Sequence, residues 1–319
     1  SFQERNIKII KDNSSPEEET AFSCLNNIQF KKLDQKRSAH LLFKTLLEKS
    51  LFSSPAACIK TIDNRIKTLE AKDAIAYAED VIQLKELKSI VQSIKPSTFS
   101  KYQRLLSFIQ KDWQWKPNQA NDRIVIFTER IETLNFLKRN LTEDLKLKDG
   151  QILSMDGTSM SDIEIQDVVE RFGRKKDKVR ILIATDIASE GINLHYQSHR
   201  LIHFDIPWSL MTFQQRNGRV DRYGQANKPL IAYLLTESNQ EKTRGDLRIL
   251  ELLIQKDQEV VDSIGDPSEF TGIYDVDAEV RKTGEAIEEG KDADQFEKEI
   301  QQTTFDPLAI LMGQTSLPT

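Results

Sequence analysis

Hydrophobic positions divide the chain into three zones with different periodicities. From residue 1 to about residue 120, apolar residues recur at helical spacing and glycine is absent. Because glycine and proline are the usual helix breakers, long uninterrupted helices are expected there. In the stretch 71–94 two series follow the helical period: Ile75, Ala78, Ile82 and Leu87 in one, and Val81, Leu84 and Val91 in the other.

The same zone predicts a helix that starts near residue 100. Ser97 and Ser100 are candidate N-caps for it, because a serine oxygen can accept a hydrogen bond from a free backbone N–H of the first turn. Its apolar residues would be Tyr102, Leu105, Leu106 and Ile109. The zone holds no cluster of catalytic residue types. It therefore predicts an inserted or bracing helical segment over residues 1–120.

Short β-branched runs alternate with helical stretches in the middle zone, residues 121–240. The runs 124–127 and 181–184 are continuously apolar, as in parallel strands that are covered on both faces. Alternating strands and helices predict an open α/β parallel sheet whose ligands bind at the carboxyl ends of the strands. The predicted strands are 123–128, 151–155, 180–185, 200–205 and 230–236, and the predicted helices are 129–141, 162–172 and 209–221.

The last zone, residues 241–319, is helical and acidic. Leu247, Leu250, Leu253 and Ile254 form one amphipathic stripe. Beyond Gly265 the chain turns polar, and 284–302 is predicted as a solvated or mobile helix with no readable function.

Composition narrows the class of protein. The 319 residues include 45 Lys and Arg against 50 Asp and Glu, a net charge of −5. This balance excludes a simple basic DNA-coating protein, so any phosphate-binding surface must be local. Two cysteines, Cys24 and Cys58, cannot build a disulfide framework and indicate a reduced, cytoplasmic setting. No apolar run is long enough to span a membrane, and no membrane partner is expected. The polar start without methionine predicts a fragment rather than a signal peptide.

The strongest candidate for chemistry is the segment 215–225, which reads QRNGRVDRYGQ. If it is helical, Gln215, Arg219 and Arg222 lie along one face. Two arginines about one turn apart can present two planar forks to one anion, and Gly218 between them allows a close backbone approach. An ordinary surface helix with solvated arginines is the competing interpretation.

Three further loops each follow a predicted strand. The segment 184–194, ATDIASEGINL, combines small and hydroxylated residues with a glycine, which suits an approaching phosphate or ribose. Thr128 is the natural N-cap after the first strand, and 155–159 reads MDGTS. Both can donate hydroxyl or N–H groups to nucleic-acid phosphates. A helix cap explains each loop equally well.

Together these residues resemble the C-terminal lobe of superfamily-two helicases. Residues 125–128 resemble motif IV, 155–158 the motif after it, 184–194 motif V, and 215–222 motif VI with its Q-x-x-G-R-x-x-R pattern. The added Tyr223, Gly224 and Gln225, with the sequence DIPW at 205–208, resemble the Snf-type branch, which includes chromatin remodellers and bacterial RapA. The resemblance covers roughly 115 residues. It implies a RecA-like sheet flanked by helical segments.

The resemblance also implies roles on the ATP side. Arg222 would be the arginine finger on the γ-phosphate, Arg219 would help to bind or sense the phosphates, and Gln215 would lie near the triphosphate. ATP with Mg²⁺ would be held mainly by an N-terminal lobe that this sequence lacks. The residues expected on the nucleotide side of the cleft are Asp186, Glu190, Gly191 and Gly218.

On the nucleic-acid side the resemblance implies contacts with the backbone of a tracked strand. Double-stranded DNA is the expected partner, with RNA as the alternative, and the second partner is the N-terminal lobe of the same protein. Tracking of this kind needs only local positive or N–H-rich surface, so the net negative charge is no obstacle. The residues expected at this contact are Thr128, Gly157, Thr158 and Thr185.

Two departures limit the expected activity. The nearest match to a phosphate-binding loop, residues 284–292, has five residues between its glycines, ends in Asp292 and is acidic, so we reject it. No Asp-Glu dipeptide occurs anywhere in the chain. We therefore expect half of an ATPase, inactive alone and cytoplasmic or associated with the bacterial nucleoid.

Two tempting signals are discounted. His195, His199 and His203 have the spacing of zinc ligands on a helix, but 201–204 reads as a strand, which separates them. Trp113 and Trp115 could stack on bases, although packing of the helical zone against the α/β domain explains them better.

Three functions remain open at this stage. The first is the motor half of a Snf-type, DNA-stimulated translocase, which the Trp208 and Gly224–Gln225 signature favours by resemblance. The second is half of a strand-separating RNA or DNA helicase. The third is a non-catalytic lobe kept as a binding scaffold, against which the intact Gln215, Arg219 and Arg222 argue.

Overall fold

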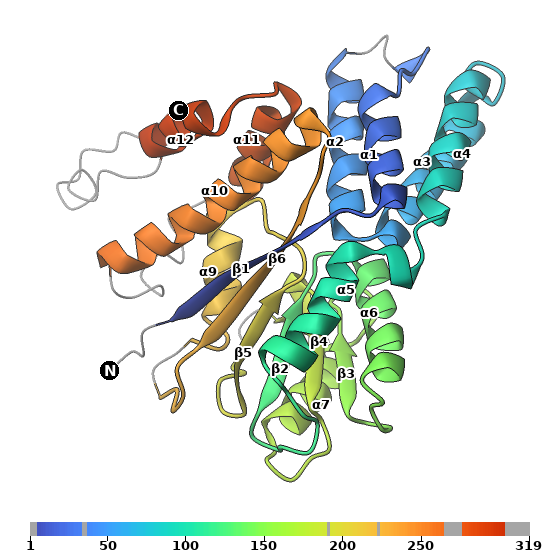
Figure 1. Ribbon diagram of the computed structural model, residues 1–319. Coiled ribbons are helices and arrows are strands. Elements are labelled where there is room, and N and C mark those ends of the chain that lie inside the picture. Colours follow the sequence, from blue (N-terminus) through green and yellow to red (C-terminus); the bar gives the residue numbers. More distant parts are fainter. Residues whose placement is uncertain (1–4, 34–36, 190–191, 222–223, 265–275, 304–319) are drawn as a thin grey trace.

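A six-stranded parallel sheet forms the centre of the protein in the computed structural model (Figure 1). The structure describes residues 5–33, 37–189, 192–221, 224–264 and 276–303. The strand order is β1-β6-β5-β2-β4-β3, and every neighbouring pair is parallel. The strands are β1 (Asn6–Asn13), β2 (Arg123–Phe127), β3 (Ile152–Met155), β4 (Ile181–Ala184), β5 (Ser198–His203) and β6 (Leu230–Glu237).

All five strands predicted in the middle zone are present within two residues of their predicted bounds. One further strand was missed. The prediction of helix from residue 1 is wrong for β1, which pairs with β6 from Asn6 opposite Leu230 to Asn13 opposite Glu237. An edge strand takes its partner from elsewhere in the chain, so a short run such as NIKII carries little local signal. The N-terminal zone therefore contributes a strand to the sheet as well as helices.

Each face of the sheet has its own hydrophobic core, as two-sided burial of the apolar strands requires. Ile124, Ile126 and Ile183 point into the first core, and their neighbours Val125 and Leu182 point into the second. Helices up to α6 contribute to the first core, and helices from α7 onward contribute to the second. This arrangement confirms the predicted fold class of a parallel sheet with helices on both faces.

The N-terminal segment forms a helical group at one end of the sheet (Figure 1). Its first helix begins with a capping box, in which Ser15 and Glu18 satisfy each other's free backbone N–H groups. The elements are α1 (Pro16–Asn27), α2 (Arg37–Ser53), α3 (Pro55–Asp73), α4 (Ala78–Gln92), the 3₁₀ turn η2 (Pro96–Thr98), α5 (Ser100–Ser107) and the π-helical turn η3 (Phe108–Asp112).

Only one of the two predicted apolar series in this segment is a core face. Val81, Leu84 and Val91 are buried, as is Leu87. Ile75 and Ile82 are 91% and 56% exposed, because α3 ends at Asp73 and a turn separates it from α4. A helix assumed to run through residues 74–77 assigns these side chains to the wrong face.

The predicted serine caps of α5 are also wrong. Its N-cap position is Phe99, which makes no side-chain cap hydrogen bond. The backbone N–H of Ser100 instead donates to the Glu18 carboxylate at 3.2 Å. The cap therefore comes from α1, 82 residues earlier in the chain.

Four helices connect the middle strands. They are α6 (Ile131–Asp144), α7 (Asp162–Gly173), α8 (Asp186–Ser189) and α9 (Leu210–Asn217). The predicted helices 129–141 and 162–172 correspond to α6 and α7. The predicted helix 209–221 is shorter than expected, since α9 ends at Asn217.

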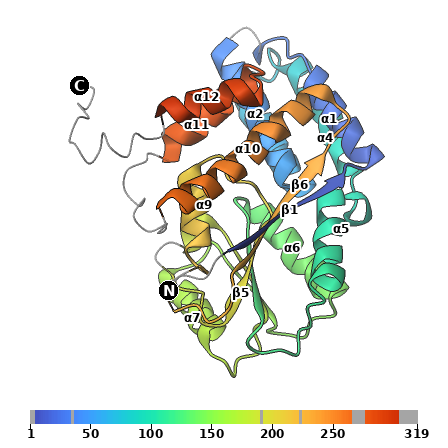
Figure 2. The ribbon, with the colours of Figure 1, turned by 60° about the vertical axis from the view of Figure 1, so that its left-hand side comes forward.

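The C-terminal segment packs on the second face (Figure 2). The predicted leucine stripe is buried along α10 (Glu241–Ile264) against the sheet and α9. The single helix predicted over 284–302 is wrong, because α11 (Val276–Glu288) and α12 (Ala293–Thr303) are separated by a turn. Gly290 lies in that turn with φ +63°, a conformation that favours glycine.

Candidate functional site

The loops that carry the four motifs meet at the carboxyl edge of the sheet. Phe127 pairs with Ala184 and with His203, and Met155 pairs with Ala184. The chain positions immediately after these strands therefore lie side by side. The backbone N–H of Thr128 donates to the Ala184 carbonyl, and that of Thr185 donates to the Met155 carbonyl, each at 3.1 Å.

The turn after β3 presents two exposed hydroxyls. Asp156 accepts hydrogen bonds from the backbone N–H groups of Thr158 at 3.0 Å and Ser159 at 2.7 Å, and also from the Ser159 hydroxyl at 2.6 Å. Burial works against the charged carboxylate, but these hydrogen bonds lower the Asp156 pKa below its usual value. Thr158 and Ser159 are exposed, and Gly157 is half-buried. The hydrogen bonds to Asp156 thus fix the conformation of the turn, while the side chains of Thr158 and Ser159 are accessible to a partner.

The turn after β2 is organised by Asp205, which follows β5. Its carboxylate accepts hydrogen bonds from the Thr128 hydroxyl and, at 2.8 Å, from the backbone N–H of Glu129. Thr128 is fully buried and is not an N-cap, because the N-cap position of α6 is Arg130. The Thr128 hydroxyl therefore faces the protein interior, and the cap predicted for it is wrong.

The motif VI segment is helical only in its first part. Beyond Asn217 the chain forms turns in which the N–H of Arg219 donates to the Arg216 carbonyl at 3.1 Å. The helix on which Gln215 and Arg219 were predicted to share a face therefore ends before Arg219. A Cβ on Gly218, at the end of the helix, would lie 3.1 Å from the Gln214 carbonyl oxygen. The side chain of Arg219 is half-buried, and its Nη1 donates to the Ile192 carbonyl at 3.3 Å.

Arg216 joins motif VI to motif V. Its guanidinium is almost fully buried and donates to both carboxylate oxygens of Asp186, at 2.6 and 2.9 Å. Burial by itself lowers an arginine pKa, but Asp186 outweighs this effect and raises the Arg216 pKa above its usual value. Asp186 was predicted on the nucleotide side of the cleft. The structure gives it a structural partner at that edge.

A chain of buried hydrogen bonds continues from Arg216 into the protein. Arg216 Nη1 lies 3.3 Å from Nδ1 of His203, whose Nε2 lies 2.7 Å from Oδ1 of Asn217. Asn217 Nδ2 donates to Asp257 of α10 at 3.2 Å and to the Tyr233 hydroxyl at 3.0 Å. Burial, with the charge of Arg216, holds the His203 pKa well below its usual value, so the ring is neutral. This network ties the motif VI helix to the C-terminal segment.

Asp257 is the far end of this network. Its carboxylate also accepts a hydrogen bond from Gln214. Burial raises the Asp257 pKa to about 7, against the opposing effects of Arg5 and of the hydrogen bonds from the neighbouring side chains. Arg5, just before β1, pairs with Asp221 of the motif VI segment. Arg5 from the N-terminal segment and Asp257 from the C-terminal segment therefore both bind side chains of the motif VI segment.

Gly224 and Gln225 have a structural role at the amino edge of the sheet. Gly224 has φ +95°, which a residue with a Cβ adopts only with strain. The buried Gln225 amide donates to the carbonyls of Ser198 and Val220, both at 2.9 Å, and of His195 at 3.3 Å. It thus holds the start of β5 against the end of the motif VI segment.

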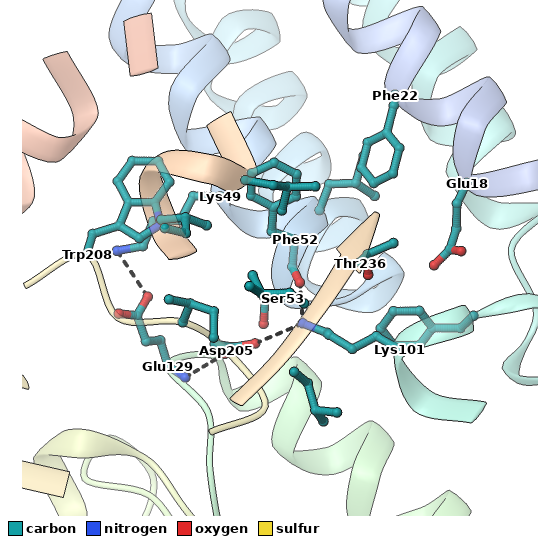
Figure 3. A pocket seen from close by; sticks show the side chains of 17 residues that line it. Glu18, Phe22, Lys49, Phe52, Ser53, Lys101, Glu129, Asp205, Trp208 and Thr236 are labelled. Carbon is teal, nitrogen blue, oxygen red and sulfur yellow. Dashed lines mark hydrogen bonds and ion pairs between the residues drawn. The ribbon is translucent and has the colours of Figure 1, made fainter. Parts of the chain in front are cut away.

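The N-terminal helices meet the carboxyl edge at a buried lysine (Figure 3). Lys101 of α5 lies 3.6 Å from Asp205 and donates to the Phe52 carbonyl of α2. Burial lowers the Lys101 pKa to about 8, against the opposing charges of Asp205 and Glu18. The adjoining cavity of about 40 Å³ has room for water molecules. Asp205 therefore connects the helical segment to the turn that carries Thr128.

Trp208 links the two helical segments. Lys49 of α2 lies over its ring, 5.0 Å from the centroid, and the Thr283 hydroxyl of α11 donates to its carbonyl at 2.9 Å.

The tryptophans discounted as base-stacking candidates pack internally. Trp115 is 5% exposed and donates to the Asp122 carbonyl, and Trp113 packs against Phe108 and Arg200.

The three histidines do not form a metal site. Among the described residues, no group of three or more His, Cys, Asp or Glu side chains is placed to hold a metal ion. His203 is buried in β5 and stacks on Tyr233, whereas His195 lies in a loop and contacts Tyr196.

Three predicted site residues, Glu190, Gly191 and Arg222, lie outside the described residues.

Comparison with known proteins finds a match for the region of the chain that forms this edge. Residues 100–224 match the family model described as the helicase conserved C-terminal domain. This region of the chain is similar to the C-terminal domain that helicases share. The match includes α5 to α9 and all four motif loops, and it ends at Gly224.

Relatives with this domain differ in what their names describe. The chain is 25% identical over 264 residues to an uncharacterized ATP-dependent helicase, YqhH, of Bacillus subtilis, covering 80% of this chain and 40% of that protein. It is 28% identical over 216 residues to the ATP-dependent RNA helicase DBP8 of Scheffersomyces stipitis, covering 66% and 45%. It is 30% identical over 130 residues to the RNA polymerase-associated protein RapA of Pseudomonas aeruginosa, covering 35% and 14%. The chain thus spans less than half the length of these relatives.

A solved structure shares the fold over most of the chain. The C-terminal part of the Fun30 ATPase domain aligns with a TM-score of 0.50 at 18% identity, covering 80% of this chain and 88% of that one. This likeness in fold covers more of the chain than the family model does. No helix among the described residues is both long and apolar enough to cross a membrane.

Several residues that organise the carboxyl edge and the motif VI segment have no role predicted from the sequence. They are Arg5, Arg216 and Asp257, which are charged residues with little exposure. Arg216 stood inside the motif VI sequence, and only its burial separates it from Arg219. Its position in the motif was the signal that Arg216 could have a role, but that position did not indicate whether the side chain points into the protein or toward solvent.

Proposed function

We propose that this chain is the second motor lobe of a Snf-type, ATP-dependent translocase that acts on double-stranded DNA. The observation that carries the proposal is the pair Arg216–Asp186, which fixes the motif VI segment at the carboxyl edge beside motif V. Ligands of open parallel sheets bind at that edge. An N-terminal lobe would hold ATP and Mg²⁺ across the cleft.

Arg219 and Arg222 are the proposed arginine fingers. A transferring phosphoryl group spreads charge over three oxygens, and a guanidinium fork stabilises that charge with about 10³–10⁵-fold effect on rate. In support, the half-buried Arg219 follows directly on a helix that is anchored by buried bonds. Gln215, on the same helix and half-buried, would lie near the triphosphate, as would Gly218, Glu190 and Gly191.

The nucleic-acid backbone would contact the turn after β3 and its neighbours. The exposed Thr158 hydroxyl and the Gly157 backbone can donate to phosphate oxygens. Thr185 and Thr128 would contribute through backbone position, because their side chains are buried. Closure of the cleft on ATP would move this grip relative to the partner lobe and so advance the protein along DNA.

The test is ATP hydrolysis by the two-lobed parent protein with and without duplex DNA. We expect Arg219→Ala and Arg222→Ala each to lower kcat by at least 10³-fold with little change in DNA affinity. Arg139→Ala, on an exposed arginine of α6, is the matched control and should hydrolyse ATP normally. Normal turnover by both finger variants would refute the proposal, as would turnover by this chain alone.

Strand separation is a second candidate, because one relative is named an RNA helicase. A displacement assay on the parent protein distinguishes the two. ATP hydrolysis stimulated by duplex DNA without strand release supports the translocase. ATP-dependent release of a short RNA or DNA strand supports the helicase. Nucleic-acid binding without hydrolysis would indicate a scaffold.

A further inference from the structure

The strongest concentration of positive charge lies away from every helicase motif. Residues 171–180 read RFGRKKDKVR, with six basic residues and one acidic residue, in a chain whose net charge is −5. This segment joins α7 to β4 at the amino edge of the sheet. A local surface of this kind attracts polyanions whatever the total charge of the protein.

A buried arginine holds this segment in one conformation. Arg123, at the start of β2, is fully buried, and its guanidinium donates to backbone carbonyls of Arg174 at 2.7 Å and Asp177 at 3.3 Å. It also donates to the carbonyls of Arg171, Phe172, Lys175 and Ala120. Because the carbonyls turn inward, the side chains of Arg174, Lys175, Lys176 and Lys178 are exposed.

A second loop adds to the same surface. Lys146 and Lys148, between α6 and β3, are exposed. A Cβ on Gly150 in that loop would lie 3.5 Å from Nη2 of Arg171 and 3.7 Å from Cδ of Lys178, so the two loops are in contact. We call the six exposed side chains the basic platform: Lys146, Lys148, Arg174, Lys175, Lys176 and Lys178.

Few carboxylates pair with the basic platform, although Glu143, Asp144 and Asp149 are exposed beside Lys146 and Lys148. Arg174 pairs with Glu170 at 2.8 Å, and Asp177 is directed to Arg171 at 3.3 Å. In the part of the chain that the structure describes, none of the five lysines forms an ion pair. None of the exposed large hydrophobic residues lies on these loops either. Since lysine is depleted from protein interfaces and these need apolar anchors, the surface fits a phosphate backbone better than a protein.

The basic platform and the motif loops lie at opposite edges of the sheet. Its loops precede β3 and β4, whereas Thr158 and Thr185 follow them. Four-residue strands separate the two edges by roughly 13 Å. Figure 1 shows α7 at the end of the molecule away from α1 to α4.

We propose that the basic platform is a second, sequence-independent binding surface for the nucleic-acid backbone, separate from the contact at the carboxyl edge. The inference rests on the proposed function only in that the parent protein works on nucleic acid. Because Arg123 already holds the backbone of residues 171–177, binding need not order that loop, and each phosphate contact releases about one counterion. The platform would hold a flanking stretch of duplex while the cleft moves.

The test measures binding of this chain to a mixed-sequence 30-base-pair DNA duplex by fluorescence anisotropy over a range of salt concentrations. The variant is Lys175→Gln/Lys176→Gln/Lys178→Gln, and the control is Lys60→Gln/Lys67→Gln/Lys72→Gln on the exposed side of α3. We expect the platform variant to bind about tenfold more weakly, with the slope of log K against log salt lowered by about 2 to 3. The control should retain affinity and slope.

Three results would overturn the inference. They are absence of duplex binding by the unmodified chain, equal loss in both triple variants, or binding of polyglutamate as tightly as duplex through the same lysines. ATP hydrolysis by the parent separates this inference from the proposed function. Platform-dependent binding without nucleic-acid-stimulated hydrolysis keeps the inference and rejects the motor. Stimulated hydrolysis with platform-independent binding does the reverse.

Discussion

The two edges of the sheet each contain a buried arginine, but the two arginines have different partners. At the carboxyl edge Arg216 pairs with the carboxylate of Asp186. At the amino edge Arg123 donates only to backbone carbonyls. Burial, with Arg180 nearby, lowers the Arg123 pKa to about 10, and it stays charged at neutral pH.

Other residues at each edge show this contrast only in part, because Arg200 and Asp122 form an ion pair at the amino edge, at 2.6 Å, and Arg216 also donates to the Asp205 carbonyl at the carboxyl edge, at 3.0 Å. Gln225 and Arg180 hold the amino edge through carbonyl oxygens. Asp205 holds the carboxyl edge through Thr128 and Lys101. Hydrogen bonds to backbone carbonyls constrain the path of a loop, whereas an ion pair between side chains can be exchanged for a charged ligand. The comparison teaches that the amino-edge loops are held by a guanidinium that binds only backbone, whereas the motif VI segment is held by a charge pair that a charged ligand can compete for.

Replacing Arg123 should have the largest effect on stability. Arg123→Met leaves several buried carbonyls without donors, so we expect the free energy of unfolding to fall by about 4 kcal/mol. Urea denaturation measures the change, with the exposed Arg139→Met as control. A loss below 1 kcal/mol would mean that water replaces the guanidinium and that Arg123 does not hold the amino-edge loops.

The pair Arg216–Asp186 is expected to show strong coupling in a double-mutant cycle. Arg216→Met, Asp186→Asn and the double variant should give a coupling free energy of about 3 kcal/mol, because Arg216 is almost fully buried. Urea denaturation of the four proteins provides the values. Additive effects, within about 0.5 kcal/mol, would contradict the role of this pair in fixing motif VI.

Asp257 should make stability depend on pH. Its folded-state pKa of about 7 lies above the 3.8 of an ordinary aspartate, so its contribution is complete below pH 4 and is lost as pH rises through 7. Between pH 5 and pH 8 we expect a loss of about 2 kcal/mol that is absent from Asp257→Asn. Urea denaturation at each pH tests this. Parallel pH profiles for the two proteins would show that Asp257 titrates normally.

The smallest expected effect concerns Gly224. At φ +95° an alanine is strained, and its Cβ meets only His195 Nε2 at 4.0 Å, so Gly224→Ala should cost about 1 kcal/mol from backbone strain. Gly173→Ala, at a position with open space around it, is the matched control and should not destabilise the protein. Thermal unfolding compares them. Equal melting temperatures would remove the argument that this turn requires glycine.

Local patterns were sufficient where each residue's neighbours in sequence decide its environment. The runs around Ile124 and Ile181 are buried on both faces in any register, so they predicted parallel strands directly. Loops after such strands must meet at one edge, and this placed the four motifs together.

Partners that are distant in sequence decided the rest. The strand β1 needs β6, more than 220 residues away, and the cap of α5 comes from Glu18. Arg216 and Arg219 lie in the same motif, but one is buried against Asp186 and the other is half exposed, because α9 ends between them. A sequence states which charges are present and their order. Only packing determines which of these charged side chains are buried. Burial is the reason that residues such as Arg216 and Arg219 differ in interaction energy and in proposed function.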